Sequence, residues 1–142
     1  MNRFLISTVE TGAEVAFVMY DLQTDAVVEH VTAYGESLSR GLQLTKLSIQ
    51  HELGHLRVFW TYLANRGVPL AGVNDAALAN FRDLALAAAI GSPSHRSNMD
   101  AARRTVNAKL IRIYDWLLWL KEGGYVPAHL IGGPPSQVRT AL

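Results

Sequence analysis

A long apolar repeat in the last third of the chain most constrains the fold. Between about Asp100 and Glu122, apolar residues recur every three or four positions, which places them on one side of an α-helix. The residues of this seam are Val106, Leu110, Ile113, Leu117 and Leu120. Gly123 and Gly124 follow directly, and glycine commonly ends helices. Because most helical stability comes from packing an apolar face, the repeat predicts a mainly helical core.

The same spacing predicts three further helices. One starts at the capping residues Thr24 and Asp25 and ends at Gly41, with apolar contacts from Val27, Val28, Val31, Tyr34 and Leu38. Another runs from about Lys46 to Asn65, with a seam of Ile49, Leu53, Leu56, Trp60 and Leu63. A third is capped by Asn74 and contributes Leu78, Phe81, Leu84 and Leu86.

The two ends of the chain have a different character. Residues 3–9 and 14–20 are rich in β-branched and aromatic residues and are separated by Thr11 and Gly12, which predicts a hairpin or extended arm. A Gly-Gly-Pro-Pro run after His129 is typical of a linker. We therefore expect an N-terminal arm over residues 1–24, a helical domain over 25–127, and a linker over 128–142 towards a domain absent from this chain.

Composition excludes several classes. The 142 residues are 49% hydrophobic and contain no cysteine, which excludes a disulfide framework and cysteine-based zinc sites. The sequence has no apolar run of about 18 residues and no targeting signal, so we expect a cytoplasmic protein without a membrane partner. Residues 1–40 carry two basic and six acidic side chains, and residues 41–142 carry eleven basic and six acidic ones. The positive charge of the helical part favours a polyanionic partner.

The pentapeptide His51-Glu52-Leu53-Gly54-His55 matches the HExxH zinc-hydrolase motif. Catalytic zinc usually takes three protein ligands, and the extended motif would require Gly at 58 and His at 61, where this chain has Val58 and Thr61. At about 100° per residue, His51 and His55 also lie opposite the apolar seam of their helix. Two solvated histidines, or histidines that face a phosphate backbone, are the alternatives that the residues leave open. We expect no metal or other cofactor.

An ordered set of segments between about Val28 and Val126 resembles the N-terminal core-binding domain of tyrosine recombinases, or phage integrases. The stretch from Arg104 to Leu110, continued by an aromatic-rich apolar helix and two glycines, resembles the last helix of that domain. The segments at 44–49, 56–60, 63–67 and 73–78 resemble its earlier helices in the same order. The chain departs from the pattern at Glu52, where the family often has Tyr, and at Ala108 and Lys109, where it often has two arginines.

The resemblance implies a four-to-five-helix orthogonal, SAM-like bundle that grips one side of a DNA duplex. It also implies that the catalytic arginines and tyrosine nucleophile belong to a second domain, so this chain is not an enzyme by itself. Oligomers would form only in the full-length recombinase on DNA, at the nucleoid. The residues expected to contact DNA are Lys46, Ser48, His51, His55, Arg96, Arg103, Arg104, Thr105, Asn107, Lys109 and Arg112.

Two other functions remain open from the sequence. One is a zinc hydrolase centred on His51, Glu52 and His55. The other is a helical protein-interaction module that uses the acidic N-terminal arm. The basic residues could equally form an ordinary solvated helix face, because charged side chains usually lie outside.

Overall fold

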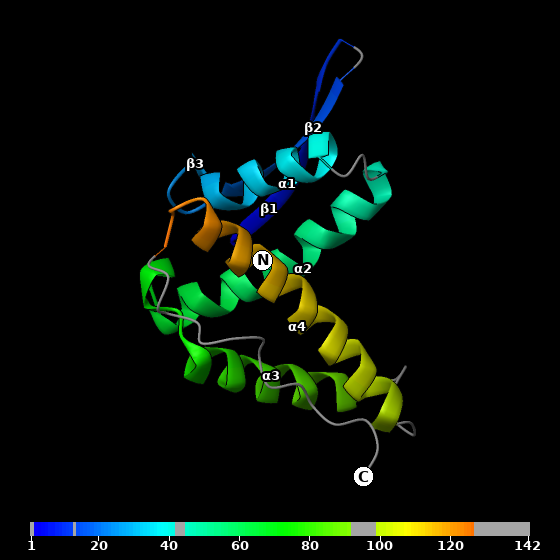
Figure 1. Ribbon diagram of the computed structural model, residues 1–142, viewed down its shortest axis with the longest axis vertical. Coiled ribbons are helices and arrows are strands. Elements are labelled where there is room, and N and C mark those ends of the chain that lie inside the picture. Colours follow the sequence, from blue (N-terminus) through cyan, green and yellow to red (C-terminus); the bar gives the residue numbers. More distant parts are fainter. Residues whose placement is uncertain (1, 13, 42–44, 92–98, 127–142) are drawn as a thin grey trace. The chain divides into compact units, whose positions relative to one another are not determined.

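The computed structural model describes residues 2–12, 14–41, 45–91 and 99–126 (Figure 1). These are mainly helical, with a small antiparallel sheet at the N-terminus, which confirms the expected mainly helical class with N-terminal strands. The orthogonal, SAM-like arrangement remains a prediction. The elements are β1 (Phe4–Thr11), β2 (Glu14–Asp21), β3 (Ala26–Val27), α1 (Glu29–Gly41), α2 (Lys46–Arg66), a 3-10 turn (Leu70–Gly72), α3 (Asp75–Ile90) and α4 (Met99–Glu122). The chain forms two compact units, Met1–Asn65 and Arg66–Leu142. The predicted linker lies outside the described residues, and the predicted domain boundaries remain a prediction.

The predicted N-terminal hairpin is confirmed. β1 and β2 pair antiparallel, with Phe4 opposite Asp21 and Thr11 opposite Glu14, and β2 also pairs with β3. Gly12 in the connecting turn has a φ of +65°, which glycine adopts without steric strain. The hairpin extends past α1 (Figure 1).

The predicted start of the first helix is wrong. Ala26 and Val27 pair with β2, and the helix begins only at Glu29. The reason lies in Asp21, whose carboxylate accepts the backbone N–H groups of Gln23 and Thr24 and so stabilises a turn there. Asp25 follows with a φ of 59° in the left-handed region, which is incompatible with a helix start at Thr24 or Asp25.

One face of the hairpin packs against α1. Phe4, Phe17 and Met19 are buried on that face, and Val31, Tyr34 and Leu38 are buried on α1. The Met19 N–H donates to Thr32 Oγ1 at 3.0 Å, which ties the strand to the helix. The hairpin is thus part of a packed unit with α1.

The second helix matches its predicted bounds to within one residue, but not its predicted seam. Its buried residues are Ile49, Leu53, Leu56, Phe59 and Leu63. Phe59 therefore replaces Trp60, which is half-buried and meets the Phe4 ring edge-on at 6.4 Å between centroids. Thr45 caps the helix by accepting the Ser48 N–H at 3.2 Å.

A close approach between α1 and α2 occurs at Gly35. A Cβ atom at this position would lie 3.0 Å from Leu53 Cδ1, and Leu53 is fully buried. Gly54, one residue further along α2, has open space around it. The two helical glycines therefore differ in what a side chain would meet.

We expect Gly35→Val to destabilise the protein by about 1–3 kcal/mol, because it overpacks a filled contact. The control is Gly54→Ala, which adds a methyl group in open space and should stabilise the helix by up to about 1 kcal/mol. Urea unfolding measures both. Equal effects of the two substitutions would contradict the contact between Gly35 and Leu53.

In the second unit, α3 and α4 pack against each other. The predicted Asn74 cap is confirmed, since its side chain accepts the Ala77 N–H at 2.9 Å. On α3, Leu78 and Phe81 are buried, whereas Leu84 is 45% exposed and does not belong to the core. All five predicted seam residues of α4 are buried, together with Ala102 and Trp116.

The end of α4 is a Schellman turn. Tyr125 N–H bonds to the Leu120 carbonyl at 2.9 Å, and Gly124 N–H to the Lys121 carbonyl at 3.1 Å. Gly124 has a φ of 78°, as this motif requires. The turn places Tyr125 on Trp119, with the stacked rings 5.4 Å apart between centroids, so Trp119 packs against the end of its own helix. Among the described helices, none is long and apolar enough to cross a membrane.

Candidate nucleic-acid interface

The outer face of α4 is the strongest candidate for binding a polyanion. Its exposed residues are Arg104, Ala108, Ile111, Arg112 and Asp115. Between Ala101 and Tyr114 the sequence has four basic residues and no acidic one. Arg104 and Arg112 are two helical turns apart on this face, about 12 Å along the axis at 1.5 Å per residue. We call Arg104, Ala108 and Arg112 the basic ridge.

The basic ridge has a small side chain at its centre, and an acidic residue follows its C-terminal end. Ala108 stands between the two arginines, so the backbone can approach a flat or grooved partner closely there. Asp115 lies one turn beyond Arg112 on the exposed side and introduces a negative charge. The stretch of α4 with exposed basic residues and no carboxylate therefore lies in the N-terminal two-thirds of the helix.

Arg103 and Thr105, also expected to contact DNA, are occupied within the helix. Arg103 is 28% exposed and pairs with Asp100 at 3.6 Å, while its buried Nε has no hydrogen-bond partner among the described residues. Thr105 is half-buried and donates its hydroxyl to the Ala101 carbonyl at 3.0 Å. Both side chains therefore interact within α4 and contribute little to its outer surface.

Asn107 and Lys109 lie on opposite flanks of α4. Both are half-buried, and two residues differ by about 200° around a helix axis. A partner that binds the outer face can therefore contact only one of these two flanks, unless it bends around the helix. Arg96 lies outside the described residues. The structure therefore brings Arg104 and Arg112 together on one face and separates the other α4 candidates from it.

The α2 residues expected to contact DNA belong to the first unit, and they too lie on different sides of their helix. Lys46, Ser48 and His51 are exposed, and His55 is half-buried. Lys46 lies about 140° around the axis from His51, so the two do not share a face. Ser48 accepts a hydrogen bond from the Thr45 hydroxyl at 3.0 Å as part of the helix cap. The Thr-x-x-Ser spacing was the signal for this role, which the sequence interpretation missed.

Two exposed apolar side chains flank the HELGH motif on α2. His51 is exposed between Leu47, which is 62% exposed, and Val58, which is 42% exposed. Glu52 and His55 are half-buried. Across residues 2–12, 14–41, 45–91 and 99–126, no three His, Asp or Glu side chains are grouped to hold a metal ion. The described part of the chain thus supplies no third ligand for this motif.

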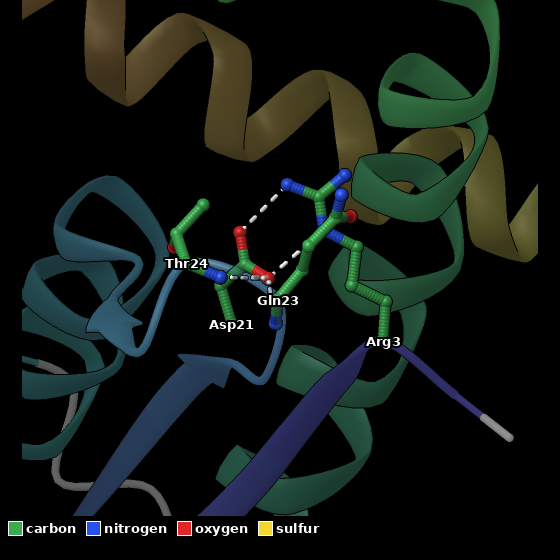
Figure 2. A network of polar contacts seen from close by, with 4 residues as sticks. All are labelled: Arg3, Asp21, Gln23 and Thr24. Atoms are coloured by element: carbon green, nitrogen blue, oxygen red, sulfur yellow. Dashed lines mark hydrogen bonds and ion pairs between the residues drawn. The ribbon is translucent and has the colours of Figure 1, made fainter.

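A polar network of four residues lies at the base of the hairpin (Figure 2). Arg3 donates through Nε and Nη2 to the two carboxylate oxygens of Asp21, each at 2.8 Å. The Gln23 N–H, at 2.9 Å, and the Thr24 N–H, at 3.4 Å, donate to Oδ1 of the same carboxylate. Asp21 is 6% exposed. With all its partners within the first unit, this cluster stabilises the fold and offers no open site.

These hydrogen bonds, that of Arg3 foremost, hold the pKa of Asp21 well below its usual range. Because the folded-state pKa is depressed, the ionised carboxylate stabilises the fold above the unfolded pKa of about 3.9. That contribution disappears as the pH falls from there towards the folded-state pKa. Asp21→Asn should therefore lower stability at neutral pH and flatten the acid limb of the stability curve.

Urea unfolding between about pH 7 and pH 2 measures this slope. The control is Asp83→Asn, which removes an exposed carboxylate paired with Arg82 at 3.0 Å and 66% open to solvent. Acid sensitivity that persists unchanged in Asp21→Asn would contradict the role of the network.

Comparison with known proteins adds no assignment: no protein-family model, curated protein or solved structure matches this chain.

Proposed function

We propose that this chain binds duplex DNA through the basic ridge of α4. The observation that carries the proposal is the pairing of two exposed arginines, two turns apart, on a helix face without carboxylates between them. Arginine recognises phosphate oxygens in a bidentate manner and stays charged at all physiological pH values. A face of this kind suits a polyanionic backbone better than a small neutral ligand.

The surroundings of the ridge support a grooved partner. Ala108 has the smallest side chain after glycine, and it lies at the centre of the contact. Arg104 and Arg112 would contact phosphates on either side, which sets position, whereas a helix that enters the major groove can also read base edges. Lys109 on one flank extends the positive surface.

We further propose that the DNA binding serves site-specific recombination. The support is the resemblance of residues 28–126 to the core-binding domain of tyrosine recombinases, together with the mainly helical fold. In this proposal, the SAM-like bundle grips the duplex and a separate domain cleaves it. The chain alone should then bind DNA without forming a covalent phosphotyrosine link to it. In the cell, this binding would take place at the nucleoid.

The salt dependence of binding tests the proposal. A labelled duplex titrated with the chain should be retained at low salt, and log K should fall linearly with log salt. Each neutralised phosphate contributes a slope of about 0.9. A slope of at least about 1.8 is expected from the two ridge arginines. Absence of binding at low salt, or binding that salt does not weaken, would refute the proposal.

A further inference from the structure

The two histidines of the HELGH motif lie on the same side of α2. His51 and His55 differ by about 40° around the helix axis and by about 6 Å along it. His51 is exposed and His55 is half-buried. Two histidines at this spacing on a helix can bind one metal ion together. The pair therefore supplies two nitrogen ligands from a single helix.

One copy of the chain does not complete a metal site at this pair. Zinc takes four tetrahedral ligands in structural sites, and imidazole nitrogen is one of its usual ligands. In the part of the chain that the structure describes, no three His, Asp or Glu side chains are grouped to hold a metal ion. Two copies related by a two-fold axis present the same side of α2 to each other and so supply four imidazoles. A second copy thus provides the ligands that one chain lacks.

The residues around the two histidines allow a second α2 helix to approach. Leu47 and Val58 are 62% and 42% exposed, and a Cβ atom at Gly54 would meet nothing within 4 Å. These three positions and His51 lie about 100–160° around the helix axis from Leu53, which is fully buried. No Asp, Glu, Lys or Arg of α2 falls in this sector. The exposed side of α2 is therefore uncharged, partly apolar and open at its centre.

We propose that His51 and His55 of two copies of this chain together bind one Zn²⁺ ion, with the two α2 helices antiparallel about Leu53. In this register, His51 of each copy lies opposite His55 of the other. Leu47 of each copy lies within one residue of the position opposite Val58 of the other. Apolar contacts then flank the ion on both sides along the helices. The inference uses α2 alone and is independent of the proposed DNA binding through α4.

Four imidazoles make this a structural zinc site. Such a site has no open position for water or substrate, whereas a catalytic zinc keeps one. Each histidine binds the ion through one of its two ring nitrogens, and the other nitrogen commonly donates to a carboxylate, a carbonyl or water. His55 can therefore keep an interaction within its own chain and still bind the ion. The proposed role of the zinc is to join two copies, with no hydrolysis.

Sedimentation equilibrium of the full chain, with and without Zn²⁺, tests the site. Zinc should convert the chain to a dimer with one ion per two chains by metal analysis, and EDTA should reverse this. His51→Ala should raise the zinc concentration needed for dimerisation by at least about 100-fold, because losing even an outer partner of a ligand costs roughly 10–100-fold in metal affinity. The control is His30→Ala, which removes a histidine of α1 and should leave dimerisation unchanged. Absence of zinc binding, one ion per chain without dimerisation, or a zinc-dependent dimer that persists in His51→Ala would each overturn the inference.

The apolar residues beside the ion have a test of their own. Leu47→Ser removes an apolar side chain from both ends of the proposed contact, so the dissociation constant of the zinc-bound dimer should rise about tenfold or more. The matched control is Leu84→Ser, which changes a leucine that is 45% exposed on α3. Circular dichroism monitors the folding of both variants. Equal effects of the two substitutions on the dimer would overturn the proposed contact between the α2 helices.

Discussion

Arg104→Glu combined with Arg112→Glu should lower duplex affinity on the order of 100-fold at about 0.1 M salt. Two lost phosphate contacts remove about 1.8 from the log–log salt slope, which corresponds to a roughly 60-fold loss at this salt relative to 1 M. The two new carboxylates add repulsion to this loss. Filter binding or fluorescence anisotropy across a salt series measures both the affinity and the slope.

The control for this variant carries the same change in net charge elsewhere. Arg40→Glu combined with Arg66→Glu reverses two exposed arginines on α1 and α2. It should keep most of the affinity, because neither arginine belongs to the basic ridge whose phosphate contacts the proposal invokes. Equal losses in the two double variants would show that overall charge, and not the basic ridge, accounts for binding. Circular dichroism on both variants monitors folding.

Trp116→Ala should be the most damaging single substitution for stability, at about 3–5 kcal/mol. Trp116 is fully buried on α4, and its removal leaves a large cavity in the core. Total stabilities of domains are about 5–15 kcal/mol, so the variant approaches complete unfolding. Urea denaturation measures the loss.

Ile111→Ala on the same helix is the matched control. Ile111 is 44% exposed, whereas Trp116 is fully buried, so truncation at Ile111 removes less buried surface and leaves no closed cavity. Its effect should stay within about 0.5 kcal/mol. Similar losses for Trp116→Ala and Ile111→Ala would contradict the burial pattern of α4 and the outward orientation of the basic ridge.

The bounds of the helices can be predicted from the sequence more directly than the residues that each helix buries. The apolar seams predicted α2 and α4 to within one residue, because a seam that repeats every three or four residues has a definite phase. The seam does not, however, determine which of Phe59 and Trp60 is buried. Trp60 lies about 20° to one side of the centre of the predicted α2 seam, and Phe59 about 80° to the other side. Which side is covered depends on the neighbouring elements, and the structure buries Phe59.

The predicted start of the first helix was wrong for a different reason. Thr24 and Asp25 are good capping residues, but the Asp21 carboxylate accepts the nearby amides in a turn first. The bidentate bond from Arg3 to Asp21 joins residues 18 positions apart, and it depends on a strand register that the sequence did not define. Polar contacts of this kind arise from the fold.

The candidate site was predictable in part. The exposure of Arg104 and Arg112 follows from their angle to the seam, which the sequence supplies. Arg103 lies only about 60° from the centre of the α4 seam, so the same angle separates it from them. Its pairing with Asp100 was not predictable in this way, because it depends on where the helix begins. The role of Ser48 beside Thr45 was encoded locally, in the spacing of a helix cap.

Photo-cross-linking from the centre of the basic ridge tests the central proposal most directly. The chain has no cysteine, so Ala108→Cys carries a single photoreactive label on the outer face of α4. Asp83→Cys, exposed on α3, is the control. We expect the label at position 108 to cross-link to duplex DNA, salt to suppress this reaction, and the label at position 83 to react little. Equal labelling from both positions, or none from position 108 while duplex is bound, would contradict it.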